Sequence, residues 1–247
     1  MICIEALAKR YGDKMALDGL CLNVGRGKFF VLLGPNGAGK TTTLKILAGL
    51  LRPTGGRVEI NGVDWAHPSP EARRKVTYIP DFPYLYDKLT GREFMEFVAD
   101  VYSLPEQGLP QRIQAWLQTM EMDRDQDKLT EQFSDGQRQR LVFAAALLPE
   151  PELIVVDEPM VGLDPRMRHK ISHILKEKSR AGVTVLMSTH TLSLAEEMAD
   201  EIAIVDKGKC VASGSLAQLR SAAQAGASSK MEEVFFRLTE ESGEPTG

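Results

Sequence analysis

The sequence has few cysteines, no long apolar run and no excess of basic charge, and each absence excludes a class of protein. Its three cysteines, Cys3, Cys21 and Cys210, are odd in number and lack CxxC spacing, so the sequence predicts neither a disulfide framework nor a zinc site and favours a reducing cytosol. The longest apolar run, residues 141–148, covers eight positions, well short of the roughly 20 needed to span a bilayer. The formal net charge of −4 argues against nucleic acid as a partner, because binding to a phosphate backbone requires a basic face. The N-terminal residues alternate like a strand, so we expect no signal peptide.

The composition is that of an ordinary globular protein, with 43% hydrophobic and 26% charged residues among 247. In its second half, short apolar strands alternate with helical segments, a pattern typical of a parallel sheet covered on both faces. We expect one domain over residues 1–220, with a helical subdomain of about 88–148 inserted into it, and a partly flexible C-terminal extension over 221–247. The predicted strands are 2–7, 21–24, 29–33, 57–60, 153–156, 183–188 and 202–205, and the predicted helices outside the subdomain are 41–48, 166–179 and 192–198.

A glycine-rich loop separates a predicted strand from a predicted helix. Such a loop binds phosphate, because glycines let successive N–H groups turn inward and the helix N-terminus adds positive potential. We expect Lys40 to reach the β- and γ-phosphates of a nucleotide and Thr41 to supply a hydroxyl to Mg²⁺. A glycine turn with a solvated lysine is the alternative interpretation. The residues of the loop, which fit the pattern GxxxxGK[ST], are Gly34, Pro35, Asn36, Gly37, Ala38, Gly39, Lys40 and Thr41.

Two adjacent acids, Asp157 and Glu158, follow the predicted strand 153–156. In open α/β sheets, ligands bind at the carboxyl ends of the strands, so these acids are placed for metal and substrate. We assign Asp157 to Mg²⁺, through water, and Glu158 to polarising the attacking water, because phosphoryl transfer requires a positioned nucleophile and compensation of developing charge. Solvated acids at a strand end are the alternative, which the order of the two motifs disfavours.

These motifs and four further segments resemble those of the ABC transporter ATPases, over nearly the whole chain. Residues 133–140, Phe-Ser-Asp-Gly-Gln-Arg-Gln-Arg, resemble the family signature LSGGQxQR and lie just before the acidic strand, as they do in the family. Residues 162–164 resemble the D-loop, residues 188–190 resemble the H-loop, and residues 78–81 stand at the position of the Q-loop. Tyr11 matches the aromatic residue that stacks on adenine.

The resemblance implies an α/β fold with a phosphate-loop NTPase core, a mixed or parallel sheet, an N-terminal antiparallel β subdomain and a helical signature subdomain. It implies an ATP-binding and ATP-hydrolysing subunit that uses ATP and Mg²⁺ and couples nucleotide-driven dimer closure to transport. The implied partners are a second ATPase subunit, expected to be an identical chain, and a transmembrane permease subunit. The protein would then be cytoplasmic and peripheral on the inner face of the cell membrane, and similarity of residues 70–74 and 85–93 to exporter-type members favours export.

The resemblance also assigns roles to individual residues. Ser134 is a good helix N-cap, so the helix that follows would point its amides toward the γ-phosphate held by the partner subunit. His190 would contact the γ-phosphate, although a lone histidine at a strand end is often structural, and Tyr11 could instead cover the core. The expected catalytic residues are Lys40, Glu158 and His190; the metal-binding residues are Thr41, Asp81 and Asp157; and the nucleotide-binding residues are Tyr11, Gly34, Pro35, Asn36, Gly37, Ala38, Gly39, Lys40, Thr41, Thr42, Ser134, Gly136 and Gln137.

Three positions depart from the family pattern. Asp81 stands where the family has glutamine or, in some exporter-type members, glutamate, and its shorter side chain would reach Mg²⁺ only through water. Asp135 replaces the first glycine of the signature and brings negative charge near a phosphate, which a helix N-terminus tolerates. Val161 replaces a small polar residue of the D-loop.

Two other functions remain open. The chain could be a soluble ABC protein that acts on ribosomes, DNA or an assembly scaffold, although ribosome-directed relatives usually carry two cassettes and this chain has one phosphate loop. It could also be a regulatory module that binds ATP and barely hydrolyses it, which Asp81 and Asp135 suggest. The aromatic segment 82–86 would contact a transmembrane partner in the leading hypothesis, or would simply be buried beneath the helical subdomain.

Overall fold

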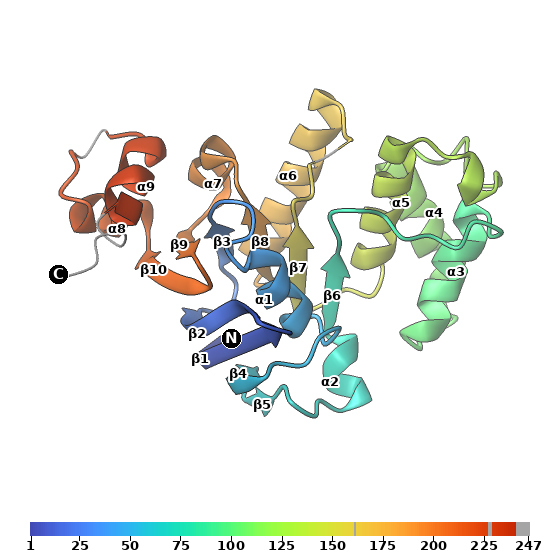
Figure 1. Ribbon diagram of the computed structural model, residues 1–247. Helices are drawn as coiled ribbons and strands as arrows, with labels where there is room; N and C mark the ends of the chain where they lie inside the picture. Colours follow the sequence, from blue (N-terminus) through green and yellow to red (C-terminus); the bar gives the residue numbers. More distant parts are fainter. Residues whose placement is uncertain (161, 227–228, 241–247) are drawn as a thin grey trace.

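The computed structural model describes residues 1–160, 162–226 and 229–240. Over these residues the strands form two sheets, one of four strands in the order β2-β1-β4-β5 and one of six in the order β10-β9-β3-β8-β7-β6. Val161, one of the departures from the family pattern, lies outside the described residues, as do 227–228 and 241–247. Figure 1 shows the smaller sheet below the larger one, with helices grouped at both ends.

The larger sheet is parallel except for one edge strand. Its strands β6, β7, β8, β3 and β9 pair in parallel, and β10 pairs antiparallel with β9. The smaller sheet is antiparallel throughout, so the predicted α/β architecture with an N-terminal antiparallel β subdomain is confirmed. The strands are β1 (Ile2–Tyr11), β2 (Lys14–Val24), β3 (Phe29–Leu33), β4 (Gly55–Ile60), β5 (Val63–Asp64), β6 (Val76–Ile79), β7 (Leu153–Asp157), β8 (Thr184–Thr189), β9 (Glu201–Asp206) and β10 (Lys209–Gly214).

The helices lie between the sheets, on the outer face of the larger sheet and at its two ends. Helix α1 packs between the two sheets, α6 and α7 cover the other face of the larger sheet, and α3, α4 and α5 lie together beyond β6 (Figure 1). Helices α8 and α9 lie at the opposite end, near β10. The helices are α1 (Lys40–Leu47), α2 (Pro70–Arg74), α3 (Gly91–Val101), α4 (Leu109–Thr119), α5 (Asp135–Leu147), α6 (Pro165–Arg180), α7 (Leu192–Met198), α8 (Leu216–Ala222) and α9 (Met231–Glu240), with a 3₁₀ turn η1 (Thr130–Gln132) before α5.

Strand β3 serves two cores, because successive side chains of a strand point to opposite faces of the sheet. Phe29, Val31 and Leu33 pack with the helices of one face, whereas Phe30 and Leu32 pack against α1 and the smaller sheet. A strand that is covered on both faces reads as an unbroken apolar run, as the sequence indicated. Burial on both sides fixes the position of the carboxyl end of the strand, from which the glycine-rich loop departs.

The N-terminal hairpin is longer than its sequence pattern predicts. Strand β1 continues to Tyr11 instead of ending at residue 7, and β2 begins at Lys14 instead of residue 21. Three register shifts interrupt the pairing of these strands, and Ala6 adopts a positive φ of 45°. Such bulges break the two-residue alternation by which strands are recognised.

The C-terminal extension is partly built into the main core. The boundary expected at residue 220 falls within α8, and the side chains of Met231, Val234 and Leu238 on α9 are buried with the helices of the larger sheet. Arg237 donates from α9 to the carbonyl oxygen of Gln224 at 2.9 Å, which ties the two helices together. This packing was not predicted, because the segment between the helices is rich in small and polar residues.

Truncating Met231 tests whether α9 contributes to the stability of the whole domain. We expect Met231→Ala to lower the free energy of unfolding by about 2–5 kcal/mol, the usual loss when a buried apolar side chain is cut to its Cβ. Phe236→Ala on the same helix removes a larger side chain that is half exposed, and should change it by about 0.5 kcal/mol or less. Equal losses in denaturant unfolding would contradict the packing of α9 described here.

Candidate functional site

The glycine-rich loop connects the end of β3 to α1 and is held in a conformation that only glycine adopts without strain. Gly37 has a φ of 82° and Gly39 a φ of 106°. Gly39 is also the N-cap of α1 and has no side chain to accept from the first amides of that helix. The loop therefore leaves backbone N–H groups available to an anion at the positive end of the helix.

Lys40 is folded back over this loop. Its Nζ donates to the carbonyl oxygens of Gly34 at 2.7 Å and Pro35 at 3.0 Å, and 6% of the side chain is exposed. Burial lowers the pKa of the Lys40 ammonium below its ordinary value, while the carboxylates of Glu158 and Asp157 act in the opposite direction. A buried cation bonded to neutral carbonyls would gain from stronger, anionic acceptors such as phosphate oxygens.

The carboxylate of Asp157 ends strand β7 and is fully buried. Its Oδ1 accepts hydrogen bonds from Thr41 Oγ1 at 3.2 Å and from Ser188 Oγ at 2.5 Å, and its Oδ2 accepts one from Tyr78 at 3.3 Å. Burial, followed by the charge of Asp157, raises the pKa of the Tyr78 hydroxyl far above its ordinary value, so this group keeps its proton and acts as a donor. Residues from α1, β8 and β6 thus converge on one carboxylate.

The side chain of Glu158 lies between two basic groups. Its Oε1 is 2.8 Å from His190 Nδ1 and 3.9 Å from Lys40 Nζ. The backbone of Glu158 has a φ of 43°, and its amide donates to the Oγ of Ser188 at 3.2 Å. This turn carries the Glu158 side chain away from the strand and toward the glycine-rich loop.

A single cavity of ≈ 440 Å³ unites most of the predicted site residues. It joins the glycine-rich loop to Tyr11 on one side and to Glu158 and Asp81 on the other. The ring of Tyr11 is about half exposed, and Lys9 Nζ lies 5.2 Å from its centroid. Within the set predicted from the sequence, the residues that line the cavity are Tyr11, Asn36, Gly37, Gly39, Lys40, Thr41, Thr42, Asp81 and Glu158.

The signature residues do not line this cavity. Ser134 caps α5, as predicted: its Oγ accepts from the amide of Gln137 at 3.3 Å, and Gln137 Oε1 accepts from the amide of Ser134 at 3.0 Å. Gly136 lies against the D-loop, where a Cβ would be 3.0 Å from the carbonyl oxygen of Gly162. Within one chain these residues and the glycine-rich loop are separate, so one copy of the chain does not bring the whole predicted set together.

The donor set at the end of β7 suits Mg²⁺. This ion is usually bound by one or two protein oxygens together with phosphates and water, and Thr41 and Asp157 offer a hydroxyl and a carboxylate 3.2 Å apart. Asp81 lines the same cavity, but its Oδ1 accepts from the amide of its neighbour Phe82 at 3.0 Å. The described residues contain no cluster of three or more acids, histidines or cysteines that could hold a metal ion unaided.

Two residues of this site were given no role from the sequence, Ser188 and Tyr78. Both lie within segments that matched family motifs, but their contact with Asp157 depends on the order of strands in the sheet. Ser188 is paired with Asp157 across β7 and β8, and Tyr78 lies on β6 on the other side of β7. The signal that could have revealed these contacts is a hydroxyl-bearing residue near the end of each of the two strands that neighbour β7.

A family model described as ABC transporter matches residues 17–161, more than half of the chain. The chain belongs to the ABC transporter family. Its relatives are ATP-binding subunits, and this protein is an ATP-binding subunit with the fold of an ATPase cassette.

The ABC transporter subunit is similar to several named proteins along most of its length. It is 38% identical over 220 residues to the daunorubicin resistance ATP-binding protein DrrA3 of Streptomyces coeruleorubidus, an alignment that covers 89% of this chain and 70% of the relative. It is 36% identical over 214 residues to the Nod factor export ATP-binding protein I of Ralstonia nicotianae, covering 87% of this chain and 67% of the relative.

Solved structures support the same assignment. One, an ATP-binding subunit of an ABC transporter, superposes with a TM-score of 0.91 at 33% identity and covers 97% of this chain and 99% of that one. Another, a dimeric ATP-binding cassette in a post-hydrolysis state with ADP and Pi, gives a TM-score of 0.80 at 28% identity and covers 87% and 99%. The subunit is therefore an ATPase of this family. Along the described residues, no helix combines the length and apolar character that crossing a bilayer requires.

Two glycines of the loop offer a matched test of its packing. Gly37→Ala places a Cβ in open space, so we expect only the cost of a left-handed backbone, about 1–2 kcal/mol. Gly39→Ala adds contacts of 2.7 Å with the carbonyl oxygen of Ala16 and the side chain of Leu17, and should lose about 1–3 kcal/mol more. Denaturant unfolding of both variants measures the difference, and equal midpoints would mean that the loop does not pack closely on β2.

Proposed function

We propose that the ABC transporter subunit hydrolyses ATP to power export through a separate transmembrane subunit, docked at the cytoplasmic face of the membrane. The observation that carries this proposal is the convergence of Lys40, Thr41, Asp157, Glu158 and His190 at the carboxyl ends of neighbouring strands. The exporters named among the relatives, which act in daunorubicin resistance and Nod factor export, support the direction. No cargo is assigned to this chain.

Each side chain of the cavity has a role in this proposal. Tyr11 stacks on adenine, the loop amides and Lys40 bind the phosphates, and Thr41 and Asp157 hold Mg²⁺, with Asp81 reaching it through water. When bound with the nucleotide, Mg²⁺ offsets charge that develops on the phosphate oxygens. The remaining members of the loop, Gly34, Pro35, Asn36, Gly37, Ala38, Gly39 and Thr42, shape the cradle.

Glu158 would act on the water that attacks the γ-phosphate. Its carboxylate follows the end of β7 and lies 3.9 Å from Lys40 Nζ of the loop, and His190 orients it through the contact of 2.8 Å. Nucleotide binding would draw Lys40 toward the phosphates and away from Glu158, which leaves the carboxylate free to accept a hydrogen bond from water. His190 would then lie between Glu158 and the γ-phosphate.

A second copy of the chain would complete the site. Ser134, Gly136 and Gln137 start α5 outside the cavity of their own chain, with helix amides available to an anion. Across a dimer these amides would close on the γ-phosphate bound to the partner, so two nucleotides would be held between two chains. The dimeric form of a structural relative supports this arrangement.

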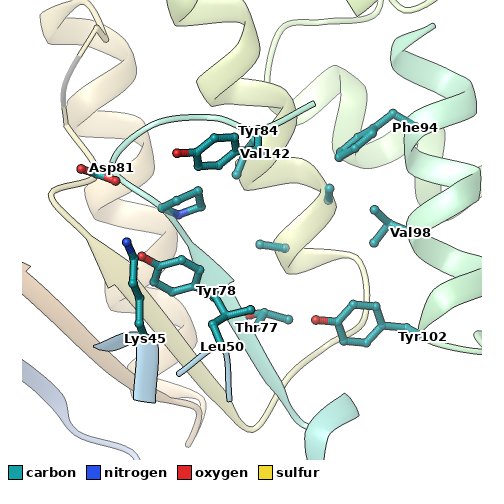
Figure 2. A pocket seen from close by; sticks show the side chains of 13 residues that line it. Lys45, Leu50, Thr77, Tyr78, Asp81, Tyr84, Phe94, Val98, Tyr102 and Val142 are labelled. Atoms are coloured by element: carbon teal, nitrogen blue, oxygen red, sulfur yellow. The ribbon is translucent and has the colours of Figure 1, made fainter. Parts of the chain in front are cut away.

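The proposed contact with the transmembrane subunit is the segment that joins β6 to α3. Its aromatic rings Phe82, Tyr84 and Tyr86 are 58%, 77% and 60% exposed, so the alternative that they are buried beneath the helical subdomain is wrong. Beside them lies a groove of ≈ 340 Å³ between β6, α3 and α5, lined by Leu50 and Phe94 among others (Figure 2). Exposed aromatics beside an apolar groove are typical of interface cores.

Glu158→Gln is the sharpest test of the catalytic assignment. The amide cannot accept a proton, so we expect the rate of phosphate release to fall by about 10²–10⁴-fold while ATP binding with Mg²⁺ is retained and the dimer becomes stable enough to isolate by size-exclusion chromatography. Glu177→Gln, on the exposed surface of α6, is the matched control and should hydrolyse ATP like the unmodified chain. Hydrolysis that survives Glu158→Gln would end the assignment, and binding without turnover in the intact transporter would favour a regulatory module.

Tyr84→Ala tests the docking surface. The side chain is exposed in the isolated subunit, so its loss should change the free energy of unfolding by about 0.5 kcal/mol or less. Loss of an aromatic anchor in an interface should nevertheless weaken co-purification with the transmembrane subunit from detergent-solubilised membranes by about tenfold or more. Phe236→Ala, an exposed aromatic on α9, should have no such effect. Recovery with ribosomal particles in place of a membrane protein would favour the soluble alternative.

A further inference from the structure

Tyr78 belongs to two sites at once. Its ring, on β6, is one wall of the apolar groove and faces the space also bounded by Tyr84 and Phe94 (Figure 2). Its hydroxyl reaches the carboxyl end of the neighbouring strand β7 and donates to Asp157 Oδ2 at 3.3 Å. The same side chain thus contacts the proposed metal-binding carboxylate and lines the surface proposed for the transmembrane subunit.

The three hydrogen bonds to Asp157 are not equivalent. Thr41 and Ser188 both donate to Oδ1, at 3.2 and 2.5 Å, whereas among the described residues Tyr78 supplies the one hydrogen bond to Oδ2. The terminal torsion of an aspartate is soft and has broad, roughly two-fold minima. Rotation about the Cβ–Cγ bond moves both oxygens together, so the donors to Oδ1 and the Tyr78 hydroxyl on Oδ2 together define the plane of the carboxylate, and Tyr78 alone holds its second oxygen among the described residues.

We propose that Tyr78 is a positioning residue for the metal site: its hydroxyl fixes the orientation of the Asp157 carboxylate, and its ring anchors that bond in the wall of the groove. This inference rests on the proposed function, because it takes Asp157 as the carboxylate that holds Mg²⁺. Hydrogen-bond partners of a metal ligand commonly change metal affinity by about 10–100-fold when they are removed.

Tyr102 provides the matched comparison. It lines the same groove from α3, but its hydroxyl donates to the carbonyl oxygen of Val76 at 3.3 Å and not to Asp157. A purely structural tyrosine of the groove should behave like Tyr102. Tyr78→Phe and Tyr102→Phe each remove one hydroxyl from a tyrosine whose side chain lines the groove, and only the first removes a donor from the carboxylate.

The test measures binding of the fluorescent analogue trinitrophenyl-ATP to the whole chain as Mg²⁺ is titrated. For Tyr78→Phe we expect the half-saturating Mg²⁺ concentration to rise by about tenfold, with unchanged binding of the analogue in EDTA. Tyr102→Phe should leave both values unchanged. The thermal unfolding midpoint of each variant checks that the fold is retained.

In the binding assay, three results would overturn the inference: an unchanged Mg²⁺ requirement in Tyr78→Phe, an equal change in Tyr102→Phe, or a loss of binding that is as large in EDTA as in Mg²⁺. If the unmodified chain bound no analogue, the proposed function would fail instead, which keeps the two failures distinct.

A measurement without substitution at Tyr78 covers the case in which that variant does not fold. The chain has five tyrosines, and all five are replaced by 3-fluorotyrosine. The ¹⁹F resonance of Tyr78 is assigned by replacing the other four tyrosines in turn. We expect this resonance to shift when Mg²⁺ is added to the nucleotide-saturated chain, and no shift would also overturn the inference.

Discussion

The burial of the Asp157 carboxylate is the constraint on which the rest of the site depends. Moving a carboxylate out of water costs several kcal/mol unless donors replace the lost hydration. Here the donors come from α1, which follows the glycine-rich loop, from β8 and from β6. Because these elements are far apart in the sequence, the carboxylate and its partners fix the relative positions of the elements that meet at this edge of the sheet.

A second feature of the site is that the Glu158 carboxylate contacts two basic side chains. Lys40 and His190 approach its carboxylate from two sides, and burial disfavours the charged form of Lys40. The lysine is therefore held near a carboxylate and two carbonyls that a phosphate would outcompete. In the proposed mechanism, this arrangement would keep the Glu158 carboxylate engaged until a bound nucleotide drew Lys40 away.

The sequence predicted the α/β fold and the candidate site residues from local patterns, and most of the residues predicted for the site line one cavity. Lys40 and Asp157 were recognised from motifs a few residues long, and β3 from an unbroken apolar run. The contacts of Tyr78 and Ser188 with Asp157 could not be predicted this way, since they depend on which strands lie side by side. The start of β2 was missed because bulges interrupt its alternation.

The departures from the family pattern have different structural settings. Asp135 occupies the first turn of α5, where a negative charge interacts favourably with the helix dipole, so it stabilises the helix even as it brings charge near the proposed γ-phosphate. Asp81 stands between the two cavities and lines both. The aspartate at this position, shorter than the glutamine or glutamate of the family pattern, is therefore placed to affect both the proposed nucleotide cavity and the groove.

Glu158 occupies a backbone conformation that suits it poorly. With a φ of 43° it adopts the left-handed region, which costs a side chain of this kind about 1–2 kcal/mol relative to glycine. Glycine at this position would relieve that cost and would at the same time remove the carboxylate that contacts His190 and Lys40. The strained turn and the acidic side chain are therefore inseparable, and a more relaxed chain here would be one without the carboxylate.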